Sequence, residues 1–133
     1  MTSTADLITA LNAHLAAFKL PSMASVRASA HTSQVTVELP CGAPSAIARG
    51  LLSWADTLTN ITAEAWRVSP GDRVHLSVTG LLSGGATVEI YGPLPATDHI
   101  PGAELAPGAT ATVTLATLRH LASPGLATEE VTY

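Results

Sequence analysis

Residues 73–91, RVHLSVTGLLSGGATVEIY, carry the clearest strand pattern in this chain of 133 residues. Apolar and polar side chains alternate on both sides of a Ser-Gly-Gly turn, which is the pattern of two half-buried strands joined by a hairpin. The apolar positions are Val74, Leu76, Val78, Val88 and Ile90, and the alternate positions are His75, Ser77, Thr79, Glu89 and Tyr91. We therefore predict that the first set packs in the core and that the second set lies on the outer face of a sheet.

A preceding strand is predicted over residues 60–68, ending at a Pro-Gly turn. Two orientations of this strand remain open. In the first, Glu64 and Trp66 share the outer face with the hairpin, while small residues such as Ala65 let a helix approach the inner face. In the second, Trp66 points into the core and Arg67 points outward. The first orientation gives an outer face that bears large aromatic side chains and few charges, which is typical of an interface.

The same reasoning predicts three helices and three further strands. These are a helix over 4–19, a hairpin over 25–30 and 35–39, a helix over 44–58, an edge strand over 109–113 and a short helix capped by Thr114. Residues 92–108 are rich in Pro and Gly and are predicted to form a long loop, either functional or mobile.

These elements predict an α+β fold with an antiparallel sheet, made of the hairpin plus a three- or four-stranded meander, and with helices packed on one face. Parallel winding is disfavoured because the links between the meander strands are too short for crossovers. We expect residues 1–126 to form a single domain, with residues 127–133 as a frayed C-terminal tail.

The charge pattern excludes some partners. Charged residues make up 12% of the chain, the net charge is −4, and the six Lys and Arg residues do not cluster, so nucleic-acid binding is not expected. No apolar run reaches the roughly 18 residues that span a bilayer, and the N-terminus lacks a basic leader, so we expect a cytoplasmic protein without membrane contact. Five Arg against one Lys, with abundant Ala, Gly and Pro, is a composition typical of GC-rich, actinobacterium-like genomes.

No catalytic motif is identified, and we assign no catalytic, cofactor-binding or metal-binding residues. The five histidines are scattered, and only Asp98-His99 sets two candidate metal ligands side by side, in the Pro-rich loop. The single cysteine excludes an internal disulfide, and we interpret Cys41 as a small apolar residue packed at a strand end.

The candidate binding residues therefore come from the outer face of the sheet: they are Glu64, Trp66, His75, Glu89 and Tyr91. We expect a small non-enzymatic interaction or regulatory module that associates as a homodimer through this face. The same face would also suit binding of another protein. The alternative is a small-ligand-binding protein or a cone-like α+β enzyme, with a pocket between helices and sheet and with residues 92–108 as a lid.

Overall fold

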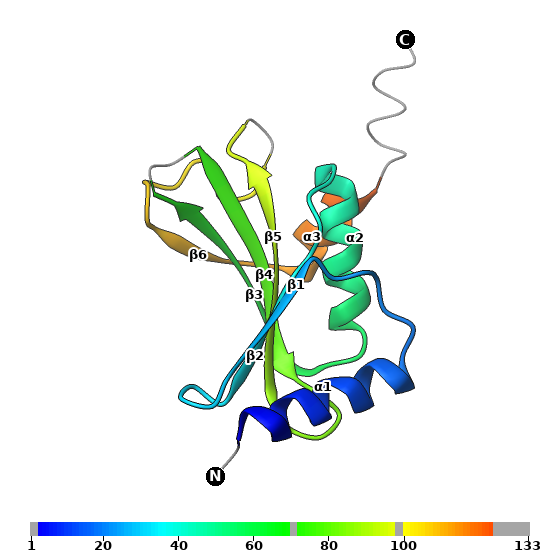
Figure 1. Ribbon diagram of the computed structural model, residues 1–133. Coiled ribbons are helices and arrows are strands. Elements are labelled where there is room, and N and C mark those ends of the chain that lie inside the picture. The colour runs from blue at the N-terminus through cyan, green and yellow to red at the C-terminus, as the bar shows by residue number, and fades with distance from the viewer. Residues whose placement is uncertain (1–2, 70–71, 98–99, 124–133) are drawn as a thin grey trace.

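The computed structural model describes residues 3–69, 72–97 and 100–123, and within them the chain forms three helices and six strands (Figure 1). The helices are α1 (Thr4–Ala17), α2 (Pro44–Ala55) and α3 (Leu115–Ala122). The strands are β1 (Ser25–Ser29), β2 (Gln34–Glu38), β3 (Thr59–Val68), β4 (Arg73–Leu81), β5 (Thr87–Pro95) and β6 (Thr110–Val113). The α+β class is confirmed. The predicted C-terminal tail and the centre of the Pro-Gly turn lie outside the described residues.

All six strands belong to one sheet, in the order β1-β2-β5-β4-β3-β6. Four of its five strand pairs are antiparallel, but β2 and β5 run parallel, so the sheet is mixed rather than wholly antiparallel. The parallel pair is compatible with short hairpin links because α2, β3 and β4 all lie between β2 and β5 in the chain. That length lets the chain return in the same direction.

The Pro-rich segment after Tyr91 is partly strand. β5 continues to Pro95, four residues further than predicted, and its last residues pair with β4 alone because the register with β2 ends at Tyr91. Proline fits there, since a strand edge without a partner needs no N–H donor. The chain then crosses back, and β6 pairs with β3 at the opposite end of the sheet order from β1.

Local signals in the sequence account for where each helix begins. The Ser3 hydroxyl accepts a hydrogen bond from the Asp6 backbone N–H at 3.1 Å, and the Asp6 carboxylate accepts one from the Ser3 backbone N–H at 3.3 Å, forming a capping box at α1. α2 begins at Pro44, whose missing N–H would have had no helical partner anyway. The Thr114 hydroxyl caps α3 by accepting from the Thr117 backbone N–H at 3.0 Å.

The core lies between the sheet and the helices. α2 and α3 lie on one side of the sheet in Figure 1, and α2 packs against β4 and β5. Trp54 of α2 is fully buried there. Close approach of α2 depends on Gly92 of β5, because a Cβ at that position would lie only 2.5 Å from the Cγ2 atom of Ile47. The other face of the sheet carries the residues considered next.

Candidate functional site

The alternation of β3 places Glu64 and Trp66 on the face of the sheet opposite α2. Ala65 is fully buried on the helix side, whereas Trp66 is 43% exposed. Of the two orientations considered for this strand, the one with Trp66 in the core and Arg67 pointing outward is therefore wrong. The Arg67 guanidinium instead donates to the backbone carbonyls of Ala103 and Leu105, and so ties residues 103–105 to the end of β3.

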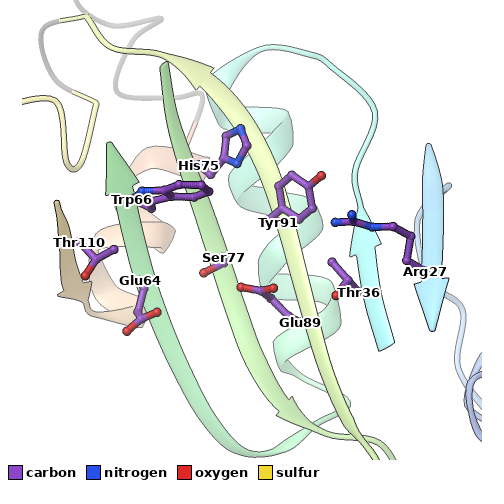
Figure 2. A pocket seen from close by; sticks show the side chains of 9 residues that line it. All are labelled: Arg27, Thr36, Glu64, Trp66, His75, Ser77, Glu89, Tyr91 and Thr110. Atoms are coloured by element: carbon purple, nitrogen blue, oxygen red, sulfur yellow. The ribbon is translucent and has the colours of Figure 1, made fainter. Parts of the chain in front are cut away.

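A hollow of about 410 Å³ opens on this outer face, and all six strands contribute to its lining (Figure 2). The lining side chains are Arg27, Thr36, Glu64, Trp66, His75, Ser77, Glu89, Tyr91 and Thr110. The structure thus brings all five sequence-derived candidates, Glu64, Trp66, His75, Glu89 and Tyr91, around one cavity. Four lining residues were not among those candidates. The alternation of β4 already placed Ser77 outward, but Arg27, Thr36 and Thr110 join the site only through the sheet order.

Three rings form a cluster along one wall of the hollow. Trp66 lies directly opposite His75 in the β3–β4 register, and their ring centroids are 5.5 Å apart with the planes at 90°. His75 in turn stacks on Tyr91 of β5, with centroids 4.9 Å apart and an angle of 26° between the planes. Edge-to-face and offset-stacked pairs are the favoured arrangements of aromatic rings. The wall is therefore a preformed aromatic surface that needs little rearrangement to accept a ligand.

Ser77 forms the floor of the hollow. It is only 8% exposed, and its hydroxyl has no hydrogen-bond partner among the described residues. In the sheet register it lies opposite Glu64 on one side and Tyr91 on the other. Figure 2 shows it at the centre of the surrounding side chains. The Trp54 indole nitrogen is the one side-chain polar atom that is fully buried and unpaired in the described chain, so the Ser77 hydroxyl reaches the hollow and is free to bind a ligand atom.

Three titratable groups of the hollow, His75, Glu89 and Tyr91, have pKa values that are shifted toward their neutral forms. Burial lowers the pKa of His75, and the positive charge of Arg73 adds to the effect while Glu38 opposes it. Burial also raises the pKa of Glu89, with a further contribution from the negative charge of Glu64, while Arg27 opposes the shift. The pKa of Tyr91 is raised by burial and by Glu38. Burial also lowers the pKa of His14, which lies in the core and not in the hollow.

The other residues considered as candidates in the sequence are Cys41 and the Asp98-His99 pair. Cys41 is exposed, so its interpretation as a packed apolar residue is wrong. The Asp98-His99 pair lies outside the described residues, and within the described ranges no three His, Cys, Asp or Glu side chains gather as a metal site would require. Residues 100–105 pack on the helix side of the sheet, where the Cα of Gly102 approaches Ala65 and Val74, and they do not cover the hollow.

Comparison of the chain with protein-family models, with curated proteins and with solved structures found no match. In the part of the chain that is described, no helix is both long and apolar enough to cross a membrane. Functional inference therefore depends on the geometry and electrostatics of the hollow.

Proposed function

We propose that the protein binds a small organic molecule in the hollow on the outer face of its sheet. The observation that carries this proposal is the convergence of an aromatic wall, the unpaired hydroxyl of Ser77 and three groups with shifted pKa values around one cavity of about 410 Å³. Ligand sites in proteins typically have volumes of about 300–1,000 Å³, with apolar walls and a few convergent polar groups. Shifted pKa values also concentrate at functional sites.

The arrangement favours binding over catalysis. Neutral His75 and the Tyr91 phenol can donate or accept hydrogen bonds without the cost of desolvating a charge. The rings of Trp66 and Tyr91 add apolar area at a low cost in side-chain entropy. This site differs from the pocket considered in the sequence-based alternative, because it lies on the face of the sheet opposite α2 and not between the sheet and its helices.

A fragment screen monitored by thermal unfolding tests the proposal. Compounds that bind the folded protein should raise its melting temperature, because binding to the native state stabilises it by about 2.7 kcal/mol at 100 times Kd. The same compounds should shift the fluorescence of Trp66 and should lose most of their effect in Trp66→Ala. Ile8→Ala, which removes an apolar side chain of similar exposure from α1, is the matched control and should respond like the wild type. Equal responses of the two variants would place binding elsewhere.

A second candidate function is homodimerisation through the same face, and the exposed indole of Trp66 favours it. With 43% of its surface exposed, this side chain would gain from burial in a self-complementary contact. The low charged fraction of 12% also provides little repulsion between copies.

Light scattering at micromolar concentration tests this second candidate. We expect a dimer at pH 7.5 that shifts toward monomer in Trp66→Ala. The dimer should also weaken on acidification, since protonating His75 inside an interface would bury a cation. A clean monomer at pH 7.5 would rule the dimer out, and a dimer unaffected by Trp66→Ala would move the interface to another surface.

A further inference from the structure

The hollow combines two carboxylates with the unpaired hydroxyl of Ser77, a residue that is only 8% exposed. Glu64 lies directly opposite Ser77 in the β3–β4 register, and Glu89 is close enough to Glu64 for their negative charges to repel, which contributes to the raised pKa of Glu89. In the described part of the chain, neither carboxylate has a Lys, Arg or His nitrogen within 4.0 Å. The contact that Glu89 does make is a hydrogen bond accepted from the Gln34 side-chain amide at 3.5 Å, the limit of such a bond.

The formal charge of the lining is negative. Arg27 lies on the opposite rim, and while its charge lowers the pKa of Glu89, one guanidinium against two carboxylates leaves one uncompensated negative charge when His75 is neutral. A positive group between Glu64 and Glu89 would relieve their mutual repulsion and would pair with both. Its N–H groups would also give the Ser77 hydroxyl the hydrogen-bond partner that it lacks.

The aromatic rings of the hollow indicate what the uncharged part of the ligand should be. Trp66 on β3 and Tyr91 on β5 flank β4, which carries His75 and Ser77 (Figure 2). Indole and phenol faces attract cations through the ring quadrupole, and they also bury flat apolar groups by stacking. Carboxylates beside aromatic rings therefore favour a cation with an apolar body over an anion of the same shape.

We propose that the ligand of this hollow is a small organic ammonium ion with a flat apolar body, its ammonium group bound above Ser77 between Glu64 and Glu89 and its body against Trp66 and Tyr91. This inference rests on the proposed function, because it names the ligand class of the same site. It goes further in assigning the carboxylates to recognition of charge and the Ser77 hydroxyl to a hydrogen bond with the polar end of the ligand.

Three probes of similar shape but different charge test whether binding depends on the charge of the ligand. The probes are 2-phenylethylamine, 2-phenylethanol and phenylacetate, titrated into the full chain at pH 7.5 and followed by the fluorescence of Trp66 and by NMR shifts of the lining residues. The amine should bind about tenfold more tightly than the alcohol, since a charge-assisted contact adds to the shared apolar contact. Phenylacetate should bind most weakly, because the carboxylates repel it.

Variants identify the groups that recognise the charge. Glu64→Gln and Glu89→Gln keep the side-chain shape, and each should weaken binding of the amine about fivefold to tenfold while changing that of the alcohol less than twofold. Ser77→Ala should weaken binding of both the amine and the alcohol. Glu104→Gln is the matched control, since Glu104 is exposed in the loop after β5 and is not part of the lining.

The possible outcomes separate this inference from the proposed function. Equal affinity for the amine and the alcohol, or amine binding unchanged by both Gln variants, would overturn the ammonium inference and leave ligand binding in place. Failure of all three probes and of the fragment screen to bind would overturn both.

Discussion

Trp54→Ala should lower the free energy of unfolding by about 3–5 kcal/mol, the range for truncating a large buried aromatic side chain. Trp54 is fully buried in α2 and stacks on the His14 ring of α1, with centroids 6.0 Å apart and the planes at 8°. Its removal would therefore leave a cavity at the junction of two helices and the sheet. Denaturant unfolding followed by circular dichroism measures the loss, and wild-type stability of this variant would contradict the packing of α2.

Two matched variants separate the effect of packing from that of aromatic content. Trp66→Ala makes the same substitution on the outer face, where the side chain is 43% exposed, and should cost less than about 1.5 kcal/mol. Trp54→Phe keeps a ring in the core and removes the indole N–H, which is buried without a hydrogen-bond partner in the described structure. Since an unpaired buried donor is itself destabilising, Trp54→Phe should cost clearly less than Trp54→Ala.

The second large effect should come from His14, a buried imidazole that links α1 to two distant segments. Its Nδ1 accepts a hydrogen bond from the Ser83 backbone N–H at 3.2 Å, and its Nε2 lies 2.8 Å from the Thr57 hydroxyl oxygen. Because a backbone N–H can only donate, Nδ1 must be unprotonated and Nε2 carries the hydrogen. The Thr57 hydroxyl in turn donates to the Trp54 carbonyl at 2.8 Å. The network therefore requires neutral His14.

Stability should accordingly fall as the pH falls below about 6.5, the ordinary pKa of a histidine. Burial lowers the pKa of His14 in the folded protein, so between the folded and unfolded pKa values the unfolded chain binds more protons. Protonation then favours unfolding, and the stabilisation is fully present above the unfolded value and is lost toward the lower, folded one. His75 contributes with the same sign, and the raised pKa of Glu89 contributes with the opposite sign.

Comparing variants isolates the contribution of His14. His14→Ala should cost about 2–4 kcal/mol at pH 7.5, because it leaves a cavity and unpaired groups on Thr57 and Ser83. Its stability should also vary less than that of the wild type between pH 7.5 and 5.5. His31→Ala removes an exposed histidine and should change neither quantity. If His14→Ala kept the full pH dependence of the wild type, the buried imidazole would not be its source.

Much of the candidate site could be predicted from the sequence because strand alternation is a local property. Successive side chains of a strand point to opposite faces, so the apolar residues of 73–91 determine by themselves that His75, Glu89 and Tyr91 face the other way. The orientation of β3 was less certain, because Trp66 and Arg67 are adjacent and either could have been buried on side-chain chemistry alone. The contacts of Arg67 with residues 103–105 resolve that ambiguity, and they are 36 and 38 residues away along the chain.

The sequence predicts where the three helices begin, because the Ser3 capping box, Pro44 and the Thr114 cap each act within one helical turn. It also determined which side chains share a face within each strand. The order of the strands in the sheet, in contrast, does not follow from local patterns. The parallel β2–β5 pair brings Arg27 and Thr36 to the hollow, and the pairing of β6 with β3 brings Thr110. Such pairings depend on how the whole sheet buries its apolar face under α2, a property of distant residues acting together that no local pattern encodes.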